Sequence, residues 1–373
     1  MAAAPPASRR GYLDWLRGLA VLIMIEAHLI DSWTRSPDRE AQAFQWSMTV
    51  GGFGAPLFLF LAGVSVAMSA ASKARKSGDE HAASNAVVRR GLEIFALAFL
   101  FRLQACLLSW GAWWTLLKVD ILNIMGPSIM AAAALWGAVR TSGARLAAFA
   151  MATVAVALLT PVIRALPIES LPDPIEAYIR PLPGRTNFAL FPWAGFVLAG
   201  GIAGELVFAA QRPSQERRLQ LGLLISGLAG IGIAYAASFR PAIYPVANFW
   251  TSSPTFFFIR LGMCTAMVPI ARGVDHFHLF LRRRYAIGAG TTDVPGRVVA
   301  TLGRSSLFVY WIHVEMAYGA IAMPLKRALP LELSLLATVA LCALLYQIVL
   351  WKDRRMRDIE LTGGWRILAP VLK

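Results

Sequence analysis

Ten long apolar stretches dominate this sequence, and each is close to the length that a helix needs to cross a bilayer. They lie at 13–31, 48–71, 87–109, 119–138, 146–164, 188–209, 219–239, 254–271, 298–323 and 329–351. About 20 apolar residues span the hydrocarbon core as an α-helix. Hydrophobic residues make up 57% of the chain, which excludes an ordinary soluble enzyme and a disordered chain. We therefore expect an all-α integral membrane protein with about ten transmembrane helices, forming one multi-span domain over residues 1–373.

Basic residues predict how these helices are oriented. The chain has 36 Lys and Arg against 21 Asp and Glu, a net charge of +15. The loops on the side of both termini hold 23 of the basic residues, and the alternate loops hold nine. Because cytoplasmic loops carry the excess of Lys and Arg, we expect both termini in the cytoplasm. This topology predicts cytoplasmic tails at 1–11 and 352–373, an outer loop at 165–187, and a basic cytoplasmic loop at 272–297 that contains Arg282, Arg283 and Arg284.

Tryptophans gather near the predicted outer ends of the spans, where an aromatic belt contacts lipid headgroups. They are Trp33, Trp46, Trp110, Trp113, Trp114 and Trp250. We expect all six to anchor the helices at the interface.

Other composition features exclude two kinds of partner. Cys106, Cys264 and Cys342 each lie within an apolar stretch and form no CxxC pair, so neither a disulfide nor a metal site is predicted. The basic residues are dispersed through short loops rather than gathered in one domain, and nucleic-acid binding is therefore not expected. The sequence leaves a homo-oligomer open.

The first apolar stretch carries an unusual set of ionisable residues, which are costly in a membrane and usually functional. Arg17 and His28 are 11 residues apart, so they differ by only about 20° around the helix and by roughly 16 Å along it. Asp14 and Asp31 fall on the same side. Glu26 lies about 180° from Arg17 and must face another helix or water.

Further polar residues occur in three other spans. Arg89 and Arg90 begin the third, Asp120 and Asn123 begin the fourth, and Arg304 begins the ninth. The ninth span also holds His313, at a depth similar to that of His28 in the first. If these two spans are neighbours, both histidines line one cavity.

Several segments resemble those of transmembrane acyltransferases. LDWLRGLAVLIMIEAH (13–28) resembles the first helix of that superfamily, with its Arg-x10-His arrangement at Arg17 and His28. LGRSSLFVYWIH (302–313) resembles the late block that ends in His. GGFGAPLFLFLAGVSVAMS (51–69) resembles the second helix. DILNIMGPS (120–128) and NFALFPWAGFVLAGG (187–201) are more similar to the bacterial branch related to heparan-α-glucosaminide N-acetyltransferases.

The resemblance implies that acetyl-CoA binds from the cytoplasm and that its acetyl group is transferred to a sugar of a glycan or glycolipid on the far side. Its bacterial branch implies that the membrane is the inner membrane of a bacterium. The acceptor atom stays open between amine and hydroxyl, because the heparan-type enzymes place a His in the loop after the first helix and residues 32–47 here contain none. His28 occupies the position used by the sugar O-acyltransferase (acyltransferase 3) branch.

A mechanism follows from these residues as a hypothesis. His28 acts as a general base or as the acyl carrier, with Asp31 orienting it and His313 close by. Acetyl-CoA carries about four negative charges on its phosphates, which Arg17, Arg89, Arg90 and Arg304 are placed to bind. Asp120, Asn123 and Glu26 are expected to contact the acceptor.

A different class of protein fits the same physics. A transporter or flippase for a lipid-linked or anionic solute would also place Arg, Glu and His within ten spans. Binding of CoA by the purified protein would discriminate between the two.

Overall fold

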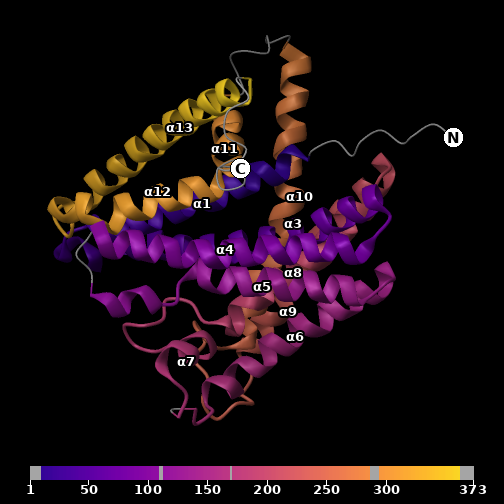
Figure 1. Cartoon of the computed structure of the whole chain (residues 1–373), viewed down its shortest axis with the longest axis horizontal. Helices are drawn as coiled ribbons and strands as arrows, with labels where there is room; N and C mark the ends of the chain where they lie inside the picture. Colours follow the sequence, from indigo (N-terminus) through magenta and orange to yellow (C-terminus); the bar gives the residue numbers. More distant parts are fainter. Residues whose placement is uncertain (1–9, 109–111, 169, 286–293, 362–373) are drawn as a thin grey trace. The chain divides into compact units, whose positions relative to one another are not determined.

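The computed structural model describes residues 10–108, 112–168, 170–285 and 294–361, and it describes side chains within these ranges except those of 278–295 and 357–361. Its regular elements are helices, joined by two isolated bridges at Thr34–Leu329 and Val119–Thr186 (Figure 1). They are α1 (Gly11–Trp33), η1 (Ser36–Glu40), α2 (Gln42–Gly51), α3 (Gly54–Ser77), α4 (Glu80–Leu108), η2 (Trp113–Leu117), α5 (Ile121–Ala138), α6 (Ser142–Arg164), α7 (Asp173–Ile179), α8 (Leu190–Ala209), α9 (Pro213–Ser238), α10 (Pro254–Tyr285), α11 (Val294–Arg304), α12 (Ser306–Tyr318), η3 (Ala320–Leu325) and α13 (Leu331–Leu361). The all-α prediction is confirmed.

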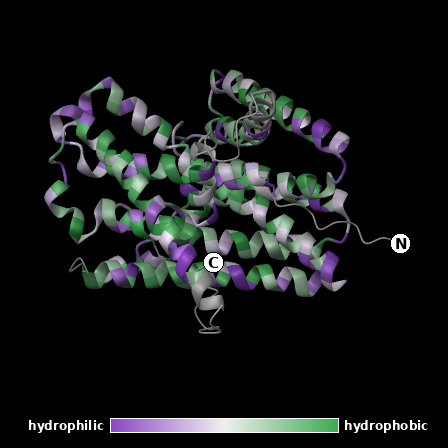
Figure 2. Cartoon of the chain, turned by 90° about the horizontal axis from the view of Figure 1, so that it is seen from above, coloured by the Kyte–Doolittle hydropathy of each residue, from purple (hydrophilic) through white to green (hydrophobic). Residues whose placement is uncertain are grey.

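Eight helical segments in the described residues are long and apolar enough to cross a membrane, which makes this an integral membrane protein. They are 42–77, 80–108, 121–138, 142–164, 190–209, 213–238, 254–277 and 331–356. Figure 2 shows hydrophobic residues along most of the length of the helices. These segments coincide with eight of the ten predicted spans. The other two, 13–31 and 298–323, fall on α1 and on α11 with α12. α1 has 23 residues but contains Asp14, Arg17, Glu26 and Asp31, and α11 and α12 have only 11 and 13 residues.

The predicted ninth span is not one continuous helix. The backbone leaves the helical region at Ser305 (φ −105°, ψ 27°), so α11 ends at Arg304 and α12 begins at Ser306. The Lys352 ammonium on α13 donates to the Ser305 hydroxyl over 2.9 Å. The sequence prediction joined the two helices because apolar residues lie on both sides of Arg304, Ser305 and Ser306, although α11 is less hydrophobic than α12.

Contacts divide the chain into two compact units. Unit 1 contains 56–270 and unit 2 contains 8–55 together with 271–373. Unit 2 is therefore assembled from the two ends of the sequence.

In unit 1 a buried polar cluster ties four helices together at one end. The Glu205 carboxylate on α8 accepts hydrogen bonds from the Trp136 indole on α5 and from the Ser142 hydroxyl on α6. The Arg145 guanidinium lies 3.7 Å from the centre of the Trp136 ring and pairs with Glu80 at 2.9 Å. The starts of α4 and α6 thus meet the ends of α5 and α8. These helices therefore alternate in direction, as consecutive membrane spans must.

In unit 2, α1 packs against α2, α11, α12 and α13. Glycine permits the closest of these approaches. A Cβ added at Gly18 would lie 1.9 Å from the Val299 carbonyl oxygen, and one added at Gly303 would lie 1.9 Å from that of Asp14. Small residues allow membrane helices to approach backbone to backbone. This crossing, which we call the Gly18–Gly303 crossing, sets how α11 lies on α1.

The predicted interfacial tryptophans divide into two groups. Trp46, Trp113, Trp114 and Trp250 are exposed, as an interfacial role requires. Trp33 is buried, and its indole donates to the Ala317 carbonyl over 3.1 Å. Its expected anchoring role is therefore wrong, because it packs α1 against α12. Trp110 lies outside the described residues.

The long connections contain more helix than expected. The predicted outer loop 165–187 includes α7. In the predicted basic loop 272–297, α10 continues to Tyr285, and the side chains of Arg282, Arg283 and Arg284 lie outside the description. In the predicted tail 352–373, α13 continues to Leu361.

Candidate active site

The two histidines that the sequence placed at like depth are in contact in unit 2. His28 on α1 and His313 on α12 lie with Nδ1 of His28 3.1 Å from Nε2 of His313. Their rings are stacked, with centroids 5.2 Å apart and an angle of 12° between planes. His313 is completely buried and His28 is partly exposed. The sequence left the adjacency of these two helices open, and the structure shows that they are neighbours.

The hydrogen bonds around His313 fix where the protons lie. Nδ1 of His313 is 2.9 Å from the Val309 carbonyl oxygen, which can only accept, so Nδ1 carries a proton. A fully buried ring is most stable when neutral, and its Nε2 is then an acceptor. His28 therefore donates through Nδ1, and its basic position is Nε2. This assignment follows from the network of acceptors.

Asp31 does not orient His28 as the sequence analysis expects. Its carboxylate accepts hydrogen bonds from Arg39 (2.9 Å) and from the Tyr318 hydroxyl (3.3 Å). The orienting position on Nδ1 of His28 belongs to His313 instead. Tyr318 links the two groups, since its ring lies edge-on to His28 with centroids 5.5 Å apart. Sequence reasoning missed both Arg39 and Tyr318, which no pattern in the sequence marks.

Glu26 faces away from this histidine pair, as its angle on α1 predicts. Its Oε1 accepts a hydrogen bond from the Ser47 hydroxyl on α2. Its Oε2 is buried without a hydrogen-bond partner in the described residues. The structure therefore places Glu26 on the α2 side of α1, apart from His28.

A cavity of about 510 Å³ lies in unit 2 near the start of α1, with Arg297 and Arg304 of α11 in its wall. Two aromatic residues, Trp15 and Tyr346, also line it, together with Asp275. Arginine binds phosphate oxygens through paired donors, and aromatic rings stack on bases. These are the chemical requirements of a nucleotide end such as that of CoA. Arg297 was missed, although its spacing of seven from Arg304 puts both on one helical face.

The other predicted phosphate-binding arginines are placed differently. Arg17 is not among the residues that line this cavity, and it donates to the buried Asp14 carboxylate at 2.9 Å. Arg89 and Arg90 belong to α4 in unit 1, where Arg90 pairs with Glu93 at 2.8 Å. Of the four, the structure brings Arg304 alone into the cavity wall.

Asp120 and Asn123 form a capping box at the start of α5 in unit 1. The Asp120 carboxylate accepts from the backbone of Ile121 and pairs with Arg102 at 2.5 Å. Asn123 donates to the Tyr178 hydroxyl on α7 over 3.3 Å. Burial raises the pKa of Tyr178. These contacts give both residues a structural task, and their predicted contact with an acceptor remains a prediction.

The described residues contain no group of three or more His, Cys, Asp or Glu side chains that could hold a metal ion. The features that remain are a helical bundle with eight membrane-crossing segments, a histidine pair between α1 and α12, and an arginine-lined cavity. Together they define the class as a helical membrane protein with a paired histidine and an arginine-lined cavity in unit 2.

A family model described as heparan-alpha-glucosaminide N-acetyltransferase, catalytic, matches residues 9–239, more than half of the chain. The chain belongs to this family and is a membrane acyltransferase, and the family uses acetyl-CoA. No curated protein matches the chain. His28 lies within the matched segment, whereas His313 and Arg304 lie beyond it. The family match favours an enzyme over a transporter, and the similarity to sugar O-acyltransferases stays a prediction.

Proposed function

We propose that this protein transfers an acetyl group from cytoplasmic acetyl-CoA to an amine or hydroxyl of a glycan or glycolipid across the membrane, with His28 as the general base. The observation that carries the proposal is the 3.1 Å contact between Nδ1 of His28 and Nε2 of His313. A buried, neutral His313 holds His28 in one tautomer and directs the basic Nε2 away from the pair. That is the arrangement a general base needs.

The donor would bind in two parts. The nucleotide end fits the cavity that Arg297, Arg304, Trp15 and Tyr346 line. The thioester arm would follow α1 from Trp15 to His28, a distance of about 20 Å along the helix axis. Both termini lie in the cytoplasm in this proposal, and the cavity at the start of α1 is then on the side where acetyl-CoA is found.

The chemical step balances with these groups alone. The acceptor nitrogen or oxygen forms a bond to the acetyl carbonyl carbon, and the carbon–sulfur bond breaks. His28 Nε2 takes the proton that the acceptor loses and returns it to the sulfur of the departing CoA. In the alternative order, His28 itself takes the acetyl group from CoA and then passes it to the acceptor. The stacked His313 supports either order, since both need a fixed imidazole.

The test is acetyl transfer in native membranes. Membranes that contain the protein are incubated with isotope-labelled acetyl-CoA, and the labelled glycan or glycolipid is identified. His28→Ala should abolish transfer while the variant still binds CoA and keeps its thermal denaturation midpoint. His81→Ala is the matched control, because His81 is an exposed histidine on α4 and its loss should leave transfer unchanged. Full transfer by His28→Ala would refute the assignment.

A further inference from the structure

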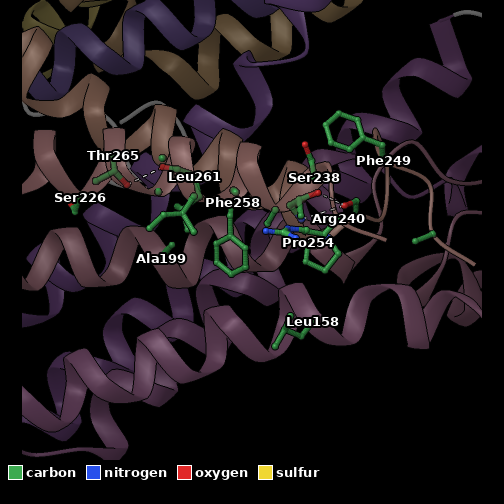
Figure 3. Close-up of a pocket in the computed structure, with 18 of the residues that line it drawn as sticks. Leu158, Ala199, Ser226, Ser238, Arg240, Phe249, Pro254, Phe258, Leu261 and Thr265 are labelled. Carbon is green, nitrogen blue, oxygen red and sulfur yellow. Dashed lines mark hydrogen bonds between the residues drawn. The ribbon is translucent and has the colours of Figure 1, made fainter. Parts of the chain in front are cut away.

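Unit 1 contains a second, larger cavity that the proposed acetyl transfer does not use. It has a volume of about 830 Å³, within the range of pockets that bury a small ligand. Figure 3 shows it between α8, α9 and α10, with Leu158 of α6 at its lower edge. It follows one face of α9 from Leu223 to Ser238 and continues to Arg240. The 16 residues from Leu223 to Ser238 correspond to roughly 24 Å of helix, most of the thickness of a bilayer core.

The wall of this cavity consists mainly of apolar residues. Its six side-chain hydroxyls already take part in hydrogen bonds within the protein. They belong to Ser226, Ser238, Tyr244, Ser253, Thr255 and Thr265. A hydroxyl has one proton to donate, and four of the six donate theirs to backbone carbonyls. The cavity therefore offers few hydrogen-bond donors to a polar ligand such as a sugar.

One charged residue, Arg240, lines the cavity. Among the described residues that line it, Arg240 is charged and the others are neutral. Its guanidinium has no ion pair with a described carboxylate. Phe249 also lines the cavity and contacts the exposed Trp250, with ring centroids 5.1 Å apart. Exposed tryptophan of this kind marks the headgroup level of a bilayer.

The cavity is open along α9. Its inner wall is formed by buried residues of α8 such as Ala199 and Ala203, whereas Ile233 of α9 and Ile243 of the following loop are 72% and 82% exposed. In a membrane-crossing unit this open side faces lipid. A ligand that enters from the bilayer is then favoured over one that enters from water.

From these observations we propose that the cavity binds a hydrocarbon chain of an anionic phospholipid, with the lipid phosphate at Arg240. The apolar length along α9 fits the chain, and the single cation fits the phosphate. CoA is a poor occupant, because its several phosphate charges would meet one arginine. The proposal is independent of acetyl transfer, since it concerns lipid binding in unit 1.

The test uses photo-crosslinking of the full-length protein in lipid nanodiscs. The probe is a phosphatidylglycerol with a diazirine in its acyl chain, and a phosphatidylcholine with the same chain is the zwitterionic comparison. Crosslinked peptides are identified by mass spectrometry. Phosphatidylglycerol should label peptides of α9 and α10 that line the cavity, and it should label them more strongly than phosphatidylcholine does.

Two glycines on α9 provide a matched pair of variants. Gly230 lines the cavity, and a Cβ there would have only a contact at 4.0 Å to Gly262. Gly232 is absent from the lining residues and has nothing within 4 Å. Gly230→Phe should fill the cavity and lower labelling several-fold, whereas Gly232→Phe should label as the wild type does. Equal labelling of both variants, whether high or low, would overturn the cavity as the binding site.

Arg240 provides the test of charge. Arg240→Gln should lower phosphatidylglycerol labelling by about five-fold, the factor expected for one arginine near an anionic headgroup. It should leave phosphatidylcholine labelling unchanged, and Arg240→Lys should retain the preference for phosphatidylglycerol. If Arg240→Gln keeps the preference of the wild type, the phosphate does not lie at Arg240 and the proposal is wrong.

Discussion

The Gly18–Gly303 crossing gives a sharp prediction about the site, because it positions α11 on the helix that carries His28. In Gly303→Ala the new methyl carbon would lie 1.9 Å from the Asp14 carbonyl oxygen and 2.6 Å from the Gly18 nitrogen. Both partners are backbone atoms, so no side chain can move aside. The two helices must separate by roughly 1 Å, and overpacking of this kind costs about 1–3 kcal/mol.

That displacement should affect catalysis more than stability. A shift of about 1 Å at a reacting group costs on the order of 100-fold in rate. The His28–His313 contact at 3.1 Å is already near the upper limit of hydrogen-bond distance, so such a shift would break it. We expect Gly303→Ala to lower kcat by one to two orders of magnitude, with a modest fall in the thermal denaturation midpoint. The assay is acetyl transfer by purified protein in nanodiscs, measured beside that midpoint.

The matched control is Gly273→Ala on α10, also in unit 2, where an added Cβ meets nothing within 4 Å. Alanine is the better helix former by about 1 kcal/mol, so this variant should be slightly stabilised and fully active. Wild-type kcat in Gly303→Ala would refute the reasoning, since it would mean that α1 and α11 separate without disturbing the histidine pair.

Three further predictions test other parts of unit 2. His313→Phe keeps a stacked ring but removes the acceptor for Nδ1 of His28. We therefore expect kcat to fall and the pH profile of kcat to shift, while the KM for acetyl-CoA stays unchanged. An unaltered pH profile would contradict the tautomer assignment. Arg297→Ala should raise the KM for acetyl-CoA roughly tenfold, the value of one charge-assisted hydrogen bond, whereas the exposed Arg354→Ala on α13 should not. A hydrogen bond from Arg35 holds the pKa of the Asp38 carboxyl below its ordinary value. The ionised carboxylate therefore stabilises the fold above about pH 4, and this stabilisation is lost as the pH falls through the lowered pKa. The denaturation midpoint of the wild type should therefore drop more than that of Asp38→Asn between pH 5 and pH 2, and parallel curves would count against the pair.

Hydrophobic length alone predicted most of the helices, because a span must satisfy its backbone internally and can do so only as a helix. The angle of about 180° between Arg17 and Glu26 also predicted correctly that Glu26 would face another element or water. The similar depth of His28 and His313 was predicted, but whether their helices are neighbours was left open. Sequence can supply depth, since each residue of a helix adds a fixed rise, but it supplies no neighbours.

The predictions that failed are those that depend on contacts with other parts of the chain. Asp31 is one turn from His28 in sequence, yet Arg39 competes for its carboxylate from the next loop. Trp33 has the composition of an interfacial anchor, and α12 buries it. The break at Ser305 falls at three polar residues, Arg304 to Ser306, that were read as part of one span; the hydrogen bond from Lys352 of α13 to Ser305 is a contact that the sequence does not show.

The pairing of α1 with α12 also has a consequence for biogenesis. Some 285 residues separate His28 from His313, and a ribosome adding about 5–20 residues per second needs roughly 15–60 s to make them. During that interval α1, with Asp14, Arg17, Glu26 and His28, has already been made, but α12, which packs on His28, has not. The histidine pair can therefore form only after α12 (Ser306–Tyr318), near the end of the chain, has been synthesised. A chain that stops before α12 contains every residue of α1 but cannot assemble the pair.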